Sequence, residues 1–365
     1  MEIINAGTYN IYLENKNFEQ LARFLLLGQY KNIFVLADDN TIRYCMPRIE
    51  PLLKRYNYSV ILLHNGEMYK SLQSCEYIWT QLLKKGANRN DLLLNLGGGV
   101  ITDIGGFAAS VYKRGMDFVH LPTTLLSQMD ASVGGKTGID WNGIKNMIGN
   151  FANPKAVFIF SGFLYTLPER ELFSGWAEGL KHGLLQSESL WEEMQQLYFL
   201  YENKQLEGLN ALLSAGIGVK KEIVAQDWED KHIRQSLNLG HTIGHALEAW
   251  ALGQECELKH GEAVILGLIA ELNLSIKLLN ADKEKIYTIL NALKAIYQQQ
   301  PFWSQWAGVK IPVEQILPYL YADKKNENQR LRLPLWVDFG QTVIGQTVEI
   351  ADIRWALWRL EIELG

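Results

Sequence analysis

The chain contains 365 residues, of which 48% are hydrophobic and 21% are charged, and its formal net charge at pH 7 is -5. This length is greater than one hydrophobic core usually organises, so two domains are expected. The composition is typical of a globular protein, and the negative net charge argues against a general nucleic-acid binder while leaving room for a locally basic pocket.

The N-terminal sequence MEIINAGTYNIYLENK has no basic segment followed by an apolar run, so it predicts a pair of strands rather than a signal peptide. The longest apolar stretches, such as FLLL and AVILGLIA, are far shorter than the roughly 20 residues that span a bilayer. Three scattered cysteines, Cys45, Cys75 and Cys256, suit a reducing compartment. We therefore expect a soluble, cytoplasmic protein that does not enter a membrane.

The first half of the chain alternates short apolar runs with helical patterns. Strands are predicted over residues 32–39, 58–65, 91–99, 117–122 and 155–160. Amphipathic helices are predicted near residues 15–28, 41–56, 70–86 and 100–113. This alternation indicates βαβ units and a largely parallel sheet.

After about Leu167 the periodicity becomes helical almost throughout. Helices are predicted over residues 168–187, 189–203, 205–226, 238–251, 260–280 and 282–298, followed by a polar turn at 322–330, the apolar run LRLPLWVDF and a final helix. The predicted fold is an α/β, Rossmann-like N-terminal domain (1–167) joined to an all-α C-terminal domain (168–365). The cleft between such domains is the expected active site.

Three of the seven histidines lie between Leu237 and Val264. His241 and His245 are four residues apart in a helical run and therefore share a face. His260 opens the next helical run, and Glu178 lies in a third. Two imidazoles and one carboxylate from separate helices form an open three-ligand metal site with a position left for water or substrate.

The role of His245 is not fixed by spacing alone. HTIGH resembles a zinc-binding helix, but the glutamate expected directly after the first histidine is Thr242. His245 is then either the third metal ligand or an acid, base or phosphate donor that faces the substrate. His182, four residues after Glu178, is a competing ligand for which helix packing is the simpler role.

Two glycine-rich segments suggest anion contacts. Residues 97–103 (GGGVITD) follow a predicted strand and open a helix, where backbone amides favour a pyrophosphate, but Thr102 stands where the dinucleotide fingerprint requires glycine. The alternative is a tight structural turn. Residues 134–137 (GGKT) resemble the end of a nucleotide-triphosphate loop, yet Asp130 replaces its first glycine, which excludes that site. Lys136 still suits one phosphate or carboxylate.

Further charged and amide side chains are expected on turns or helix ends, several of them among glycines and apolar residues rather than on charged helical faces: Lys145, Asn146, Lys181, Lys220, Arg234, Asn238, Lys324 and Lys325. Each by itself is an ordinary solvated side chain. A pocket that collects several of them would bind a small polyanionic substrate.

These segments together resemble the 3-dehydroquinate synthases, a family of the sugar-phosphate cyclase superfamily. The shared motifs are GGGVITDIGGFAASVYKRG, LPTTLLSQMDASVGGKTGID, GIKNMIGNF, SGWAEGLKHG, LNLGHTIGHALE, KHGEAV and DKK, with NGEMYKS upstream. The resemblance runs from about Asn65 to Lys325, and it implies a dehydroquinate synthase-like fold.

The resemblance implies a role for each candidate residue. The metal ligands would be Glu178, His241 and His260, which assigns His245 to the substrate, and the metal would be zinc, with cobalt as an alternative. NAD would contact Gly66, Glu67, Tyr69, Lys70, Gly98, Gly99, Val100, Asp103, Thr123, Thr124, Lys136 and Lys145. The substrate's phosphate end would meet Lys136, Asn146, Arg234, His245 and Lys324 or Lys325, and its hydroxyls and carboxylate would meet Asp130, Lys181, Lys220 and Asn238. Arg114 matches an arginine that reaches a neighbouring subunit's site, which implies a homodimer.

Five positions depart from the family pattern: Thr102, Ala131, Asp140, Phe160 and Asp230. Thr102 and Phe160 bear on NAD, because glycine and aspartate respectively are usual there. Serine is usual at 131, asparagine at 140 and glutamate at 230. None of the five removes a metal ligand or a central substrate contact.

The activity implied is conversion of 3-deoxy-D-arabino-heptulosonate 7-phosphate to 3-dehydroquinate and phosphate, a step of the shikimate pathway and aromatic amino acid biosynthesis. It would be a carbon-oxygen lyase reaction through transient oxidation by NAD, phosphate elimination, reduction and aldol cyclisation. The alternatives are another sugar-phosphate cyclase, such as one like 2-deoxy-scyllo-inosose synthase, and a related metal-dependent polyol dehydrogenase.

Overall fold

A computed structural model describes residues 2–14, 17–142, 144–252, 257–306, 308–322 and 331–364. The chain forms two compact units, one of Met1–Gly175 with Leu197–Ala225 and the other of Trp176–Gln196 with Gln226–Gly365. Cys256, Lys324 and Lys325 lie outside the described residues. The assignment of NAD binding to 1–167 and of metal and substrate binding to 168–365 remains a prediction.

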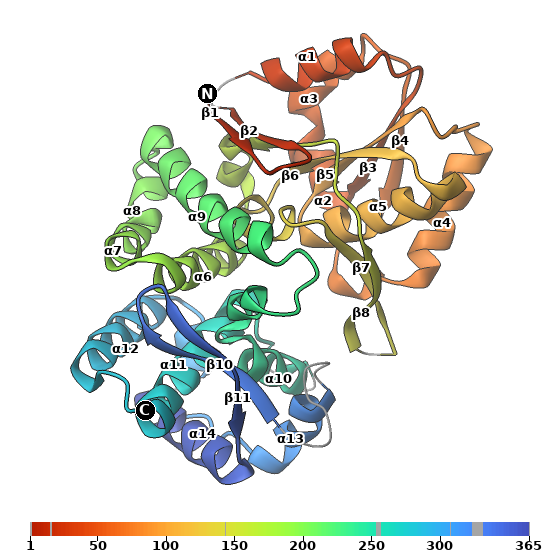
Figure 1. Cartoon of the computed structure of the whole chain (residues 1–365). Coiled ribbons are helices and arrows are strands. Elements are labelled where there is room, and N and C mark those ends of the chain that lie inside the picture. The colour runs from red at the N-terminus through yellow and green to blue at the C-terminus, as the bar shows by residue number, and fades with distance from the viewer. Residues whose placement is uncertain are drawn as a thin grey trace. The chain divides into compact units, whose positions relative to one another are not determined.

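The first unit contains a seven-stranded sheet in the order β1-β2-β9-β6-β5-β3-β4 (Figure 1). Its strands are β1 (Glu2–Asn5), β2 (Asn10–Glu14), β3 (Ile33–Asp38), β4 (Tyr58–Leu63), β5 (Leu92–Gly97), β6 (Asp117–Pro122) and β9 (Ala156–Phe160). β1 is antiparallel to β2, and the other pairs are parallel. The predicted N-terminal strand pair and the largely parallel sheet are confirmed.

Helices cover both faces of this sheet. They are α1 (Glu19–Gly28), α2 (Asp39–Tyr44), α3 (Met46–Leu53), α4 (Leu72–Lys84) and α5 (Gly99–Val111). Val35 and its alternate neighbours in β3 pack against α1 and α3, whereas Phe34 and Leu36 pack against α4 and α5. Both faces of each strand are therefore buried, which is why these strands are continuous apolar runs. The helix predicted over 41–56 is two helices, because Pro47 enters at the first turn of α3.

The strand order creates a switch point between β3 and β5. The chain proceeds from β3 outward to β4 and then returns to the other side of β3 as β5. Ligands of open parallel sheets bind beyond the carboxyl ends of strands at such a point. Gly97, Gly98 and Gly99 lie at the carboxyl end of β5.

A hairpin of β7 (Lys136–Trp141) and β8 (Ile144–Phe151) also belongs to the first unit. Neither strand was predicted: Lys136 was expected on a glycine turn, and Lys145 and Asn146 were expected on a turn or helix end. Lys136 opens β7, and the other two lie in β8. β8 was hidden because its residues are all half-buried or exposed, so no apolar face marks the strand in the sequence.

The remaining elements of the first unit are short, apart from one long helix. They are η1 (Glu67–Tyr69), η2 (Tyr112–Arg114), the π-helical η3 (Ser127–Ala131), η4 (Ser161–Thr166), α8 (Leu197–Glu202) and α9 (Leu206–Gln226). The boundary between the units falls inside α6 (Glu169–Gln186), after Gly175.

The second unit is built around one buried helix, α11. Its elements are α7 (Glu188–Gln195), η5 (Ile233–Asn238), α10 (His241–Ala251), α11 (His260–Leu279), α12 (Lys283–Gln298), η6 (Trp303–Gln305), α13 (Val313–Ala322), β10 (Leu331–Asp338), β11 (Gln341–Val348) and α14 (Ile350–Leu364). Every residue of α11 from Gly261 to Ser275 is buried. The neighbouring elements α10, α12, α14 and β10 pack against it, so its apolar sequence forms the core of a helical unit, as predicted.

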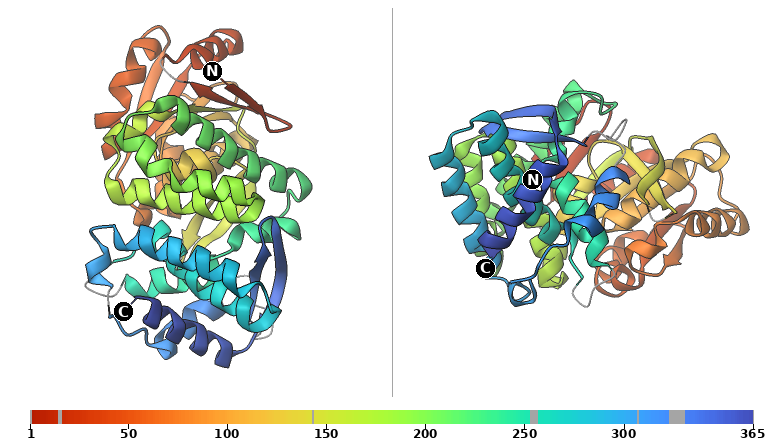
Figure 2. Two further views of the ribbon diagram at one scale, coloured as in Figure 1. Left: turned by 90° about the vertical axis from the view of Figure 1, so that its left-hand side faces the viewer. Right: turned by 90° about the horizontal axis from the view of Figure 1, so that it is seen from below.

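Three described elements of this unit, α13, β10 and β11, were missed. α13 was not predicted, and LRLPLWVDF was recognised only as an apolar run, whereas it is β10 paired with β11 (Figure 2). The indole N–H of Trp336 and the backbone N–H of Gly340 both donate to the Leu184 carbonyl, at 3.1 and 3.2 Å. The hairpin thereby satisfies a carbonyl in the last turn of α6.

No helix among the described residues combines the length and the apolar character needed to cross a membrane.

Candidate functional site

Glu178 lies in the part of α6 that belongs to the second unit, and its side chain is fully buried. Lys181, three residues later on the same helical face, forms an ion pair with the Glu178 carboxylate. The Lys181 ammonium also donates to the Leu237 carbonyl at 2.8 Å. A buried carboxylate without such a partner would be very costly, so α6 provides both charges together.

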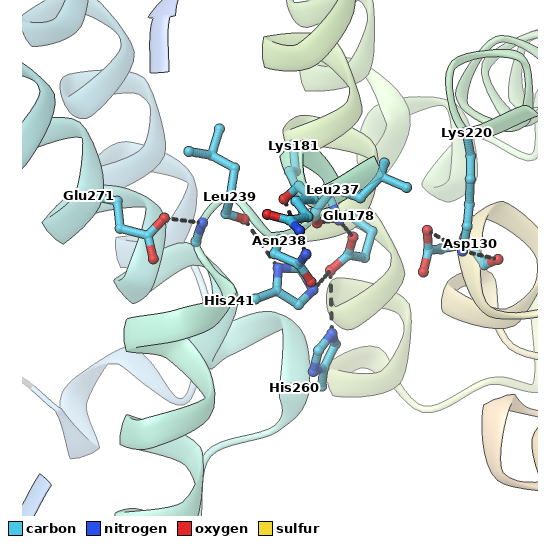
Figure 3. Close-up of polar contacts among 12 residues, drawn as sticks. Asp130, Glu178, Lys181, Lys220, Leu237, Asn238, Leu239, His241, His260 and Glu271 are labelled. Carbon is cyan, nitrogen blue, oxygen red and sulfur yellow. Dashed lines mark hydrogen bonds and ion pairs between the residues drawn. The ribbon is translucent and has the colours of Figure 1, made fainter. Parts of the chain in front are cut away.

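Two histidines from other helices converge on Glu178 (Figure 3). His241 is the first residue of α10, and its Nε2 lies 3.2 Å from Glu178 Oε1. His260 is the first residue of α11, and its Nε2 lies 3.3 Å from the same oxygen. Three segments that are far apart in the chain therefore bring a carboxylate oxygen and two imidazole nitrogens to one point.

The other ring nitrogen of each histidine also has a partner. The Nδ1 of His241 lies 3.1 Å from the Leu239 carbonyl, and the Nδ1 of His260 lies 3.8 Å from Glu248 Oε2. A carbonyl or carboxylate on one nitrogen favours the tautomer that leaves the opposite nitrogen free to bind a metal. Both rings are therefore oriented with Nε2 toward Glu178.

The electrostatics of the cluster attract positive charge. Burial raises the pKa of the Glu178 carboxyl, but Lys181 and His241 outweigh burial and hold the pKa well below its usual range. Burial, with Lys181, lowers the pKa of His241. Burial also acts to lower the pKa of His260, yet hydrogen bonds to Glu178 and Glu248 raise that pKa to about 9. The carboxylate thus draws a cation, whether a proton or a metal ion, to the point between the rings.

The donor set fits zinc. Tetrahedral zinc with ligand bonds of about 2.0–2.1 Å separates its ligand atoms by roughly 3.3 Å, and the carboxylate oxygen lies 3.2 and 3.3 Å from the two imidazole nitrogens. One oxygen and two nitrogens also leave a fourth position open, as catalytic zinc sites require. The assignment of Glu178, His241 and His260 as ligands remains a prediction.

His245 lies next to this cluster. Its ring centroid is 5.1 Å from that of His241 and 5.6 Å from that of His260, and ligand atoms of the three histidines lie within 4.8 Å of one another. Both roles considered for His245, metal ligand and substrate contact, are thus geometrically open. His182 is fully buried in α6.

The glycine turn lies in the first unit, between β5 and α5. Gly98 is the N-cap residue of α5 and has no side chain to cap the helix, so backbone N–H groups of the first turn are available as donors. A Cβ at Gly98 would lie 2.9 Å from Thr124 Cγ2. The Thr123 N–H donates to the Gly97 carbonyl at 3.0 Å and fixes the turn. This backbone surface fits a pyrophosphate.

Thr102 does not disturb the turn. Its side chain is buried, and its hydroxyl donates to the carbonyls of Gly98 at 3.3 Å and Gly99 at 3.0 Å. The hydroxyl is therefore used within the first turns of α5, which explains how a threonine replaces the glycine of the fingerprint.

Lys70 joins several candidate residues of the first unit. It follows the short helix η1, its ammonium forms an ion pair with Asp103 at 2.7 Å, and it donates to the Asn146 side-chain oxygen at 2.5 Å. Burial lowers the pKa of Lys70, but Asp103 and Glu67 outweigh burial and raise that pKa above its ordinary value. Asp140 accepts from the Asn146 N–H at 2.7 Å, so this departure from the family pattern stabilises the β7–β8 hairpin that carries Asn146.

The other candidates are distributed over both units. In the first unit Lys220 forms an ion pair with Asp130 at 2.8 Å, and Lys145 lies 4.0 Å from Glu67. Arg114 has a positive φ of 66° at the end of η2. In the second unit Arg234 is buried and donates to the Trp228 carbonyl at 2.7 Å, and Asn238 donates to the Gln235 carbonyl at 3.1 Å.

Three more residues depart from the family pattern: Phe160, Ala131 and Asp230. Phe160 lies in an aromatic cluster, 4.6 Å from Phe18 and 5.2 Å from Phe163 between ring centroids. Ala131 ends η3, and Asp230 has a positive φ of 60°.

The residues that surround the proposed ligands were not predicted from the sequence, notably Glu248, Glu271 and the carbonyls of Leu237 and Leu239. One signal for Glu271 was present, because an acidic residue stands within the apolar run AVILGLIAELNL. Its partners are backbone amides of another helix, and these have no sequence signature.

Comparison with protein families gives two adjoining matches. Residues 60–174 match the family described as 3-dehydroquinate synthase N-terminal, and residues 175–326 match 3-dehydroquinate synthase C-terminal. Similar proteins include the 3-dehydroquinate synthase of Parabacteroides distasonis, 38% identical over 90% of this chain and 91% of that protein. That of Alkaliphilus oremlandii is 36% identical over 97% and 96%.

Solved structures with the same fold are more distant in sequence. A 2-deoxy-scyllo-inosose synthase complexed with carbaglucose-6-phosphate, NAD+ and Co2+ has a TM-score of 0.81 at 21% identity, covering 98% of each chain. The 2-epi-5-epi-valiolone synthase of Streptomyces hygroscopicus subsp. jinggangensis, with NAD+ and Zn2+ bound, has a TM-score of 0.84 at 22% identity and covers 99% of this chain and 98% of that one. The predicted fold class is confirmed.

Proposed function

The chain belongs to the 3-dehydroquinate synthase family, and on this premise we propose that it converts 3-deoxy-D-arabino-heptulosonate 7-phosphate to 3-dehydroquinate and phosphate. The observation that carries the proposal is the convergence of the Glu178 carboxylate with the imidazoles of His241 and His260. The reaction class is a phosphate-eliminating lyase that requires NAD and a divalent metal.

Glu178, His241 and His260 would hold zinc or cobalt, which would supply Lewis-acid polarisation of the substrate's hydroxyls. The second unit's own residues prepare this position. Lys181 keeps Glu178 ionised, and the Leu239 carbonyl and Glu248 keep the two imidazoles oriented.

The turn at Gly98 to Asp103, the segment Gly66 to Lys70, and Thr123 with Thr124 would hold NAD, which would supply a reversible hydride acceptor. The amides at the start of α5 would bind its pyrophosphate. Lys70 holds Asp103 and Asn146 in fixed positions, which suits contacts from Asp103 to NAD and from Asn146 to the substrate's phosphate.

The cationic and amide side chains would bind a substrate that is anionic at both ends. Lys136, Asn146, Arg234 and His245 would hold the phosphate, together with Lys324 or Lys325. Lys181, Lys220, Asn238 and Asp130 would meet the carboxylate and hydroxyls. Fixing both ends restricts the substrate to one pose, which lowers the entropic part of the barrier. His245 would also donate a hydrogen bond or a proton to the phosphate as it leaves.

The test supplies purified protein with zinc, a catalytic amount of NAD and the heptulosonate phosphate, and measures phosphate release and NADH. Phosphate release without accumulation of NADH is expected, because the hydride returns to the intermediate. Release only from glucose 6-phosphate or a heptulose 7-phosphate would instead indicate another sugar-phosphate cyclase. NADH that accumulates with a polyol would indicate a dehydrogenase.

We also infer a homodimer in the cytoplasm. The dimer rests on Arg114, which matches a family arginine that reaches the neighbouring subunit. Sedimentation velocity and an activity assay of the wild type and Arg114→Ala test the dimer and the role of Arg114 separately. If Arg114 serves the partner's site, the variant remains a dimer and loses activity. Equal activity would contradict the role of Arg114, and a monomeric wild type would contradict the dimer.

A further inference from the structure

The start of α10 lacks a cap of its own. The N-cap residue is Gly240, with a φ of 78° and no side chain. The first amides of a helix have no partner within the helix, and a buried amide left without one is costly. His241, a proposed metal ligand, is the first residue of this helix, so the same turn determines where its imidazole lies.

Glu271 of α11 supplies the missing acceptor. Its side chain is fully buried, and one carboxylate oxygen accepts from the Gly240 N–H at 2.5 Å, the contact drawn at Glu271 in Figure 3. The other oxygen lies 3.4 Å from the Ile243 N–H. The carboxylate therefore spans the residues that flank His241. A negative charge at a helix N-terminus is also stabilised by the helix dipole.

The backbones of α10 and α11 are in close contact at the same place. A Cβ at Gly267 would lie 1.9 Å from the Gly240 carbonyl oxygen, and a Cβ at Gly244 would lie 2.7 Å from the Ala263 carbonyl oxygen. Only glycine permits this approach, and it brings the first turn of α10 within reach of a side chain on α11. Packing alone does not require an acid at 271, because the adjacent Ala270 and Leu272 are fully buried and apolar.

We propose that Glu271 is a positioning residue for the metal site: it anchors the first turn of α10 and thereby directs His241 Nε2 toward Glu178. This inference rests on the proposed role of His241 as a ligand. The Leu239 carbonyl orients the ring about its Nδ1, while Glu271 fixes the backbone on which the ring is carried. The two contacts act on different degrees of freedom of the same ligand.

The test compares Glu271→Gln and Glu271→Leu with a matched control, Asn273→Ala. Asn273 is also buried on α11, but its side chain donates to the Ile269 carbonyl and accepts from Arg359 of α14, away from α10. Three measurements are made on the full chain: amide hydrogen exchange over residues 239–246, the visible absorption spectrum with Co²⁺, and the Co²⁺ dissociation constant.

In both Glu271 variants the amides at the start of α10 should exchange their hydrogens faster, and the cobalt spectrum should change. Both variants should bind cobalt about 10- to 100-fold more weakly. The glutamine retains one acceptor oxygen, so its effect should be the smaller. Asn273→Ala should lower thermal stability without changing the spectrum. If Glu271→Leu does not fold, Glu271→Gln carries the test, because it preserves side-chain shape. A wild-type spectrum and affinity in Glu271→Gln, with faster exchange or without it, would overturn the inference.

A further variant, His241→Ala, separates this failure from failure of the proposed function. If His241→Ala loses cobalt while Glu271→Gln behaves as wild type, only the positioning role is wrong. If His241→Ala binds cobalt as the wild type does, the ligand assignment fails and the inference fails with it.

Discussion

The histidine cluster of the second unit and the glycine turn of the first unit are both candidate ligand-binding sites, but side chains form the first and backbone amides form the second. The cluster uses side chains from α6, α10 and α11, and Glu178 and His260 are 82 positions apart. The turn uses backbone amides of consecutive residues between β5 and α5. A site built from remote side chains depends on packing throughout its unit, whereas a site built from local backbone depends on a few φ and ψ angles and on space for the ligand.

The surroundings differ in the same way. Glu178, His241 and His260 each have a partner that holds the ligand in orientation, namely Lys181, the Leu239 carbonyl and Glu248. The turn depends instead on the Thr123 N–H bond to the Gly97 carbonyl and on the absence of a Cβ at Gly97 and Gly98. Single substitutions should therefore have large functional effects in the cluster and small ones in the turn.

The largest effect is expected from His260→Ala. Loss of one ligand should remove bound zinc and lower turnover by about 10³-fold or more, since a catalytic metal contributes several kcal/mol to the barrier. Metal analysis and phosphate release measure both quantities. His232→Ala, at an exposed histidine, should retain its zinc. Full zinc content with full turnover in His260→Ala would remove the cluster from the mechanism.

His245→Ala distinguishes the two roles considered for His245, substrate contact and metal ligand. If His245 faces the substrate, zinc content should be unchanged and turnover should fall by about 10²-fold or more, the usual contribution of a general acid or base. Zinc loss would instead support a ligand set of His241, His245 and His260, whose ligand atoms also lie within 4.8 Å of one another.

Gly267→Ala tests how much the close packing of α10 against α11 contributes to the stability of the unit that carries the cluster. The new Cβ would lie 1.9 Å from the Gly240 carbonyl oxygen, so α10 and α11 must separate, at about 1–3 kcal/mol of unfolding free energy. Urea denaturation measures the loss. Gly218→Ala in α9 is the matched control, because its added Cβ would meet no atom within 4 Å apart from its chain neighbours and the nearby backbone of its own helix, and it should be neutral or stabilising.

The smallest effect is expected from Thr102→Gly. The exchange restores the usual glycine but removes two hydroxyl contacts and places glycine inside α5, which should lower the free energy of unfolding by about 1 kcal/mol. NAD affinity measured by calorimetry should change by less than about threefold, or 0.7 kcal/mol. Thr102→Ser keeps the hydroxyl and should behave as the wild type. A large gain in NAD affinity would mean that the threonine obstructs the cofactor.

The sequence by itself determined the βαβ alternation, the helical second half and the chemical identity of the candidate site. Runs such as DLLLNLGGG and AVILGLIA predict their secondary structure because hydrophobic period, run length and glycine placement act locally. Spacing alone left the role of His245 open, and only the family resemblance selected Glu178, His241 and His260 as ligands, an assignment that stays a prediction.

Only the tertiary structure decided which atoms meet. No local pattern distinguishes a strand at Lys145 from a turn, reveals the β10–β11 hairpin that bonds to the Leu184 carbonyl, or directs Glu271 to the amides of Gly240 and Ile243. These contacts arise between backbone groups and side chains distant in the sequence. Backbone amides and carbonyls are the same in every residue apart from proline, so their partners can be read only from the folded chain.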